Sequence, residues 1–142
     1  MYSNDSTTYE NPYGNLYNWY AVTDNRVLCP NGWHAPTDAE WTILTTYLGG
    51  ESVAGGKMKS IGTWNAPNTG ATNESGFSVL PVGFRSNDGS IYNIRNYAFF
   101  WTATETGAGI IAWIRGLSSS NGSVDRNGNY KSVGASVRCL RD

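Results

Sequence analysis

Few side chains in this sequence have the chemistry and spacing that catalysis needs. General acid–base or nucleophilic catalysis uses a histidine beside a nucleophile, or two carboxylates held close together. The sequence has one histidine, His34, directly before a predicted helix start, where packing or hydrogen bonding is the simpler interpretation. Glu40 has the position of a capping partner in that helix. We therefore predict no catalytic residue, and we expect that the protein is not an enzyme.

Metal ligands are also sparse. Cys29, Cys139 and His34 are too few to complete a zinc site. Asn73 and Glu74 carry oxygen atoms that calcium could use. Calcium takes about six to eight oxygens, however, and no dense acidic cluster surrounds this pair, so hydrogen bonding within a loop is its expected role. The sequence predicts no metal site and no organic cofactor.

The two cysteines have two interpretations. A disulfide between Cys29 and Cys139 would enclose about 110 residues and stabilise the fold by roughly 4 to 5 kcal/mol. Two separate buried thiols are the alternative, and a reducing cytoplasm would require it. We predict the disulfide.

The composition excludes several classes of partner. The chain has 142 residues, with 10 Lys plus Arg against 11 Asp plus Glu and a formal net charge of −1, which gives no basic surface for nucleic acid or anionic lipid. No stretch approaches the ~18 consecutive apolar residues of a membrane helix. Asn, Ser, Thr and Gly supply 59 positions, a composition typical of short strands and long loops. We expect a disordered or linker N-terminus over residues 1–10 and a single domain over residues 11–142.

The clearest element is a helix over residues 37–49. Thr37 and Glu40 form a capping box, apolar residues follow at helical spacing, and Gly49 begins the glycine pair that ends the run. A shorter second helix is predicted over residues 51–60, although two central glycines weaken it.

Strand signals dominate after residue 75. Alternating and β-branched runs separated by Asn-Asp-Gly and Asn-Gly turns predict two hairpins. A strand at the C-terminal end is expected to pair with an early one and to bring the ends of the domain together. The predicted strands cover residues 76–85, 90–94, 110–117, 123–126, 135–140 and 16–22. Helices precede strands, so the predicted class is α+β.

Alternation along residues 110–117 separates two faces. Trp113 and Leu117 are predicted to face the core, and Arg115 on the same face then needs a carboxylate or carbonyl partner. Ile110 and Ile114 would stand on the opposite face, where an exposed apolar patch usually indicates binding. The alternative is a further layer that covers this face and makes both isoleucines core residues.

Several motifs resemble one known family, the Fibrobacter succinogenes major paralogous domain. The resemblance covers the chain from about residue 11. The motifs that carry it are Gly14-Asn15-Leu16-Tyr17-Asn18-Trp19-Tyr20-Ala21-Val22, Cys29-Pro30-Asn31-Gly32-Trp33-His34, Pro36-Thr37-Asp38-Ala39-Glu40-Trp41, Thr72-Asn73-Glu74-Ser75-Gly76-Phe77, Trp101-Thr102-Ala103-Thr104-Glu105, Ala112-Trp113-Ile114-Arg115 and Ser136-Val137-Arg138-Cys139. That family is similar to the C-type-lectin-like group, which includes variable proteins of diversity-generating retroelements. The resemblance implies linked termini, two helices and an irregular antiparallel sheet. The Glu-Pro-Asn motif of calcium-binding lectins is missing, because Ala66-Pro67-Asn68 lacks the carboxylate.

The resemblance also gives residues 106–130 a special meaning. Retroelement diversification randomises template adenines, so an AAC codon becomes NNC and never encodes Trp, Lys, Glu, Gln or Met. Between Thr106 and Tyr130 these residue types occur once, as Trp113. An ordinary loop region rich in Gly, Ser and Asn is the alternative interpretation.

Together these observations predict a non-catalytic ligand-binding domain, a diversified variable protein of a surface adhesin or phage receptor-binding protein. Its expected location is extracellular, on a cell or virion, and its partner is a protein or glycan on another surface, with an upstream anchor or fibre domain as a further expectation. The alternative is an undiversified extracellular module of the same family that binds carbohydrate or protein. The binding face is expected within residues 97–132. Its candidate residues are Tyr97, Phe99, Gly107, Gly109, Ile110, Ile111, Ile114, Gly116, Ser118, Ser119, Ser120, Asp125, Asn127, Asn129 and Tyr130.

Overall fold

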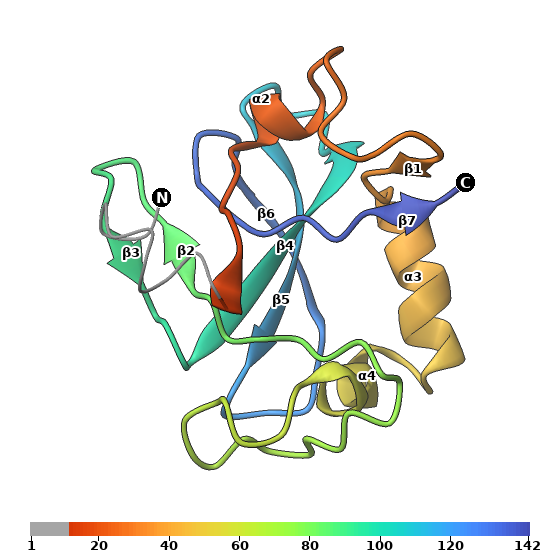
Figure 1. The fold of residues 1–142 in the computed structure, drawn as a ribbon, viewed down its shortest axis with the longest axis vertical. Coiled ribbons are helices and arrows are strands. Elements are labelled where there is room, and N and C mark those ends of the chain that lie inside the picture. Colours follow the sequence, from red (N-terminus) through yellow and green to blue (C-terminus); the bar gives the residue numbers. More distant parts are fainter. Residues whose placement is uncertain (1–11) are drawn as a thin grey trace.

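A three-stranded antiparallel sheet runs through the middle of the molecule (Figure 1). The computed structural model describes residues 12–142, so the expected linker over residues 1–10 lies outside the described part. Strands β4 (Tyr97–Glu105), β5 (Ile111–Ser118) and β6 (Asp125–Tyr130) pair in that order. The β5–β6 hairpin was predicted. Strand β4 was not, and β6 runs further along the chain than the predicted strand over 123–126.

The two predicted helices are confirmed. Helix α3 (Asp38–Tyr47) has the expected capping box: the Thr37 side chain accepts from the Glu40 backbone N–H, and the Glu40 side chain accepts from the Thr37 N–H. Helix α4 (Glu51–Met58) follows after two glycines with left-handed φ angles. A β-carbon built on Gly55 would lie 2.0 Å from the Ser123 carbonyl oxygen, so only glycine allows this approach.

The hairpin β2 (Phe84–Arg85) and β3 (Ile91–Tyr92) confirms the predicted Asn-Asp-Gly turn, but its strands are short. The prediction of a strand over residues 76–83 was wrong. Positive φ angles at Gly76, Ser78 and Gly83 interrupt the extended chain, so its ladder pairing is limited to isolated bridges at Val79 and Gly83.

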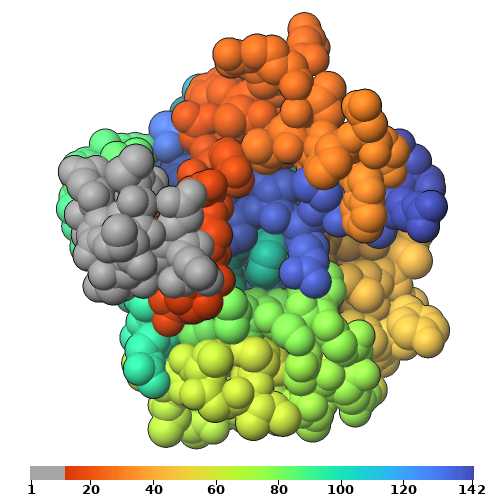
Figure 2. Space-filling view, viewed as in Figure 1, coloured from red at the N-terminus to blue at the C-terminus, as the bar shows by residue number. Residues whose placement is uncertain are grey.

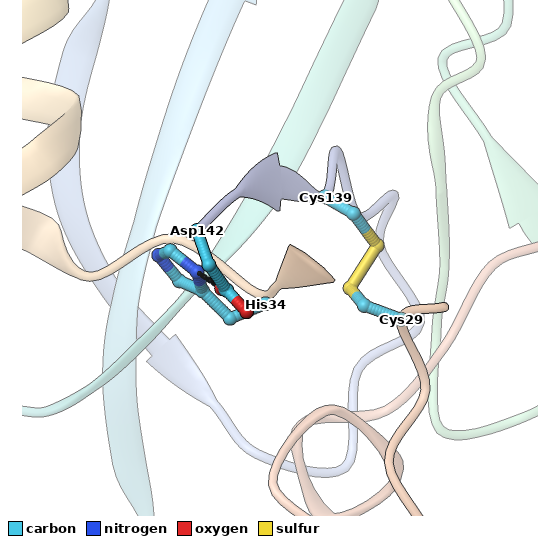
Figure 3. Close-up of a disulfide and its surroundings, with 4 residues drawn as sticks. All are labelled: Cys29, His34, Cys139 and Asp142. Atoms are coloured by element: carbon cyan, nitrogen blue, oxygen red, sulfur yellow. Dashed lines mark hydrogen bonds and ion pairs between the residues drawn. A yellow bond between two sulfur atoms is a disulfide. The ribbon is translucent and has the colours of Figure 1, made fainter. Parts of the chain in front are cut away.

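The two ends of the domain meet, as predicted. Strand β1 (Trp33–His34) pairs with β7 (Leu140–Arg141), and the Cys29–Cys139 disulfide joins the same two segments (Figure 3). The early segment does not form the predicted strand over residues 16–22. Tyr17 alone makes an antiparallel bridge, to Ala135, and the chain then turns into helix α2 (Trp19–Val22), which the Asn18 side chain caps.

Both faces of the sheet are buried. The face toward α3 and α4 packs a cluster that includes Trp41, Met58 and Leu117. The other face packs a second cluster, with Trp101 and Ile114 at its centre, against the chain segments near both ends of the domain. The alternative of a further layer over this face is therefore the correct one for Ile114. None of the helices within residues 12–142 has the length and apolar content to cross a membrane.

Candidate ligand-binding surface

Strand β6 is the open edge of the central sheet, and its side chains are largely exposed to solvent. Val124 before the strand and Lys131 after it are buried, at 1% and 5% exposure, while every residue from Asp125 to Tyr130 is exposed or half-exposed. Strand β4, at the opposite edge, is covered instead by the segment that contains Ser136: the Trp101 N–H donates to the Ser136 carbonyl, and the Ser136 N–H donates to the Phe99 carbonyl. Within residues 12–142, no backbone bond joins β6 to any strand other than β5. Strand β6 therefore exposes its side chains, and none of them belongs to either hydrophobic core cluster.

The β4–β5 loop beside this edge is held in one shape. The Lys131 ammonium donates to the Glu105 carboxylate and to the Gly109 carbonyl, and the Lys131 backbone N–H donates to the Ile110 carbonyl at 3.0 Å. The Lys131 ammonium also lies 4.5 Å from the centre of the Trp19 ring. Ile110, at the tip, is 61% exposed. The loop thus presents an apolar side chain next to the polar strand β6.

A charged network anchors β5 and β6 to the helices. Arg115 is fully buried and pairs with Asp38 at 2.8 Å and with Glu51 at 2.7 Å. The carboxylate partner that Arg115 was predicted to need is therefore present. Arg126 of β6, directly opposite Arg115, pairs with the other Asp38 oxygen at 2.8 Å and lies 3.4 Å above the Trp113 ring. Arg126 and Trp113 consequently belong to the scaffold, and their stacking could not be predicted because it depends on the register of β6 against β5.

The candidate residues divide between the two ends of the sheet. The exposed candidates near the β4–β5 loop and along β6 form a set that we call the edge surface: Ile110, Asp125, Asn127, Asn129 and Tyr130. Side chains alternate along a strand, so Asn127 and Asn129 lie on the Ile114 side of the sheet and Tyr130 lies on the Trp113 side. Gly107 and Gly109 are exposed in the neighbouring loop, and Ile111 is half-buried. Tyr97, Phe99 and Ser120 lie at the far end, where β4 begins and β5 ends, and the ring of Tyr97 stacks on that of Phe99. The structure therefore does not bring all candidates to one face.

Four candidates are buried. Ile114 is 1% exposed and packs in the second core cluster, so its predicted exposure was wrong. Gly116 is buried beneath the Phe99 ring, which a β-carbon would meet at 3.1 Å. Ser118 and Ser119 are buried in the β5–β6 turn. These positions support the fold, and a ligand cannot reach their side chains without a rearrangement.

Lys59 explains why that turn is rigid. Its ammonium is fully buried and donates to the carbonyls of Thr69, Ser118 and Asn121 at 2.8 to 2.9 Å. Burial lowers the pKa of Lys59. A lone lysine next to a glycine-rich helix carries no sequence signal for this role, and the sequence analysis missed it.

His34 has the predicted hydrogen-bonding role. Its Nδ1 lies 2.6 Å from an Asp142 oxygen (Figure 3), and its Nε2 lies 3.0 Å from a Glu40 oxygen. These bonds, first the one to Asp142 and then the one to Glu40, raise the pKa of His34 above 6.5. Asn73 bonds Ser78 within its loop, and Glu74 pairs with Lys57 at 2.9 Å.

No cluster of three or more His, Cys, Asp or Glu side chains suited to a metal ion occurs in the described range 12–142.

The chain forms an α+β domain whose two ends are joined by a disulfide and whose edge strand β6 is exposed to solvent. The family model of the Fibrobacter succinogenes major domain matches residues 1–141, and the chain belongs to this family. Comparisons with curated proteins and with solved structures gave no match.

Proposed function

We propose that this domain binds a ligand through the edge surface and performs no catalysis. The observation that carries the proposal concerns strand β6: its backbone completes the sheet, while its side chains, Arg126 excepted, make no long-range hydrogen bond or ion pair within residues 12–142. Side chains of this kind can change with little cost in stability, since exposed substitutions usually alter the free energy of unfolding by within ~0.5 kcal/mol. A recognition surface needs that freedom.

We also propose that the domain has a C-type-lectin-like fold and that it is a variable protein of a diversity-generating retroelement. The joined ends, the helices α3 and α4 and the short irregular strands support the fold assignment. Every edge-surface residue is of a type that an NNC codon encodes, which supports diversification. The Cys29–Cys139 disulfide supports an extracellular setting, because such bonds persist in oxidising compartments.

The chemistry of the edge surface suits a protein or glycan on another surface. Ile110 and Tyr130 offer exposed apolar area, and Asn127 and Asn129 offer amide groups that both donate and accept hydrogen bonds. Aromatic and adaptable polar groups of this kind are common in protein-binding surfaces. An adhesin or a phage receptor-binding protein would carry the domain at its tip.

The alternative, an undiversified carbohydrate-binding module, has one observation in its favour. Tyr130 is 55% exposed, so its ring is available to stack on the apolar face of a sugar. Trp113 is not available for such stacking, because Arg126 lies over its ring.

Sequencing the gene and its neighbourhood in many cells of the source population tests the proposal. We expect a reverse-transcriptase gene beside a near-copy of the last ~40 codons. Substitutions should fall at template adenines and concentrate in the codons of Ile110, Asn127 and Tyr130. The codons of Trp113 and Leu117 serve as internal controls and should not vary. A uniform locus with no reverse transcriptase would contradict diversification. A glycan array on which Tyr130→Ala abolishes binding would then support the alternative.

A further inference from the structure

An apolar pocket of about 290 Å³ opens between helix α3 and the C-terminal strand, away from the edge surface. Its walls include Trp41 and Leu44 of α3, Phe77, and Leu140 of β7. This volume is roughly twice the ~150 Å³ of a cavity known to hold benzene. The pocket therefore has room for a small aromatic or branched aliphatic group. A second hollow of about 330 Å³ adjoins it between the N-terminal segment, the segment near residue 80 and the C-terminal segment (Figure 2), and Phe77 and Arg138 line both.

Two groups at the apolar pocket bear on what it can hold. The indole ring of Trp41 is part of the wall, but its Nε1–H is buried away from the open space and has no hydrogen-bond acceptor within residues 12–142. A ligand in the pocket therefore meets the ring of Trp41 and not its N–H. The second group is the guanidinium of Arg138, which lies 4.7 Å above the Phe77 ring and donates to the Phe77 carbonyl at 3.3 Å. Across residues 12–142 it forms no ion pair with a carboxylate.

The one carboxylate at the rim does not pair with Arg138. One oxygen of Glu40 accepts from the backbone N–H and the hydroxyl of Thr37, and the other is bonded to His34. The exposed guanidinium of Arg138 is therefore a cation without a carboxylate partner beside an apolar pocket. Its complement is a molecule that presents a negative charge next to an apolar body.

We propose that this pocket binds a small apolar carboxylic acid, with its carboxylate on Arg138 and its apolar body between Trp41 and Leu140. An N-acyl amino acid with an apolar side chain is an acid of this kind. Planar guanidinium groups favour carboxylates because two parallel N–H bonds can form. The site is independent of the edge surface, since none of the edge-surface residues lines the pocket.

The test follows the indole N–H resonance of Trp41, assigned with Trp41→Phe, in ¹⁵N-labelled full-length protein. The probe is N-acetyl-L-phenylalanine. Two control ligands each lack one feature of this probe: N-acetyl-L-phenylalaninamide lacks the negative charge, and N-acetylglycine lacks the apolar side chain. We expect a saturable shift of the Trp41 resonance with the acid, binding weaker by roughly tenfold with the amide, and no saturation with N-acetylglycine.

Two arginine variants complete the test. Arg138→Gln should weaken binding of the acid by roughly tenfold and leave binding of the amide unchanged. Arg141→Gln, a nearby exposed arginine outside the pocket, should change neither, and Tyr130→Ala on the edge surface should also have no effect. If Arg138→Gln does not fold, the comparison of acid and amide on the wild-type protein still decides. Absence of a saturable Trp41 shift, or equal affinity for acid and amide, overturns the proposal without touching the edge surface.

Discussion

Replacing Lys59 with methionine tests the account of the rigid β5–β6 turn. Methionine keeps an unbranched side chain in the same buried space but removes the ammonium that the carbonyls of Thr69, Ser118 and Asn121 share. The turn precedes β6, so its loss would also disturb the start of the edge surface. We therefore expect Lys59→Met to destabilise the protein well beyond an average surface substitution.

The magnitude follows from the burial of the three acceptors. Leaving a buried carbonyl unpaired costs about 1 to 3 kcal/mol. Ser118 is buried, so its carbonyl takes the upper part of this range, whereas Thr69 and Asn121 are exposed residues whose carbonyls water can reach. The sum is roughly 3 to 5 kcal/mol, and the variant recovers part of the cost of burying an ammonium. The expected net loss is about 3 kcal/mol.

Urea denaturation of wild type, Lys59→Met and the control Lys57→Met gives the free energies of unfolding. Lys57 lies in the last turn of α4, two residues before Lys59, is partly exposed and pairs with Glu74, so its replacement should cost within ~1 kcal/mol. Hydrogen exchange gives a local readout, because the N–H groups of Gly56 and Thr69 bond the turn carbonyls of Gly122 and Ser119. Both should exchange faster in Lys59→Met. A loss below ~1 kcal/mol with unchanged exchange would refute the reasoning.

Three further predictions concern the core, the ends of the domain and pH. Ile114→Ala should cost roughly 2 to 5 kcal/mol, while Asn127→Ala, its exposed partner on β6, should cost within ~0.5 kcal/mol; similar losses in urea denaturation would show that β6 is part of the core. Alkylation without reductant should find no free thiol, and the reduced protein should be less stable by roughly 4 to 5 kcal/mol; two alkylated cysteines in oxidised protein would exclude the bridge. An NMR titration should place the pKa of His34 above 6.5, because Asp142 and Glu40 stabilise the imidazolium. The contribution of the His34 bonds to stability is then complete below pH 6.5 and is lost as the pH rises through the folded-state pKa. Asp142→Asn should lower the pKa of His34. A pKa of His34 at or below 6.5 in the wild type would contradict the geometry.

Local signals predicted the helices, the hairpins and the closure of the domain. Thr37 and Glu40 cap α3 through atoms only three residues apart, and the Asn-Asp-Gly turn sets its hairpin by backbone conformation alone. The two cysteines had no other partner in the sequence. The cap and the turn do not depend on the rest of the fold, so a sequence reveals them, and the disulfide could be predicted because the chain has only two cysteines.

Long-range packing decided what the sequence could not predict. Alternation along β5 separates its two faces correctly, but it cannot tell whether a second layer covers one of them, and Ile114 is buried for that reason. Strand β4 carries a nearly continuous apolar run, which periodicity does not distinguish from a buried helix. The Trp113–Arg126 stack depends on the β5–β6 register. Part of the candidate site was therefore predicted, namely the exposed residues of β6 and the β4–β5 loop, while the four buried candidates belong to the scaffold.

The central claim is that the C-terminal strands carry two separate sets of side chains, one that holds the fold and one that is free for a ligand. A pair of display libraries tests it directly, with protease resistance as the measure of folding. The first randomises the edge surface, Ile110, Asp125, Asn127, Asn129 and Tyr130; the second randomises buried neighbours in the same part of the chain, Trp101, Ala112, Ile114, Leu117 and Val124. The account predicts that most members of the first library resist protease as the wild type does and that most of the second are degraded. Equal degradation of the two libraries would contradict it.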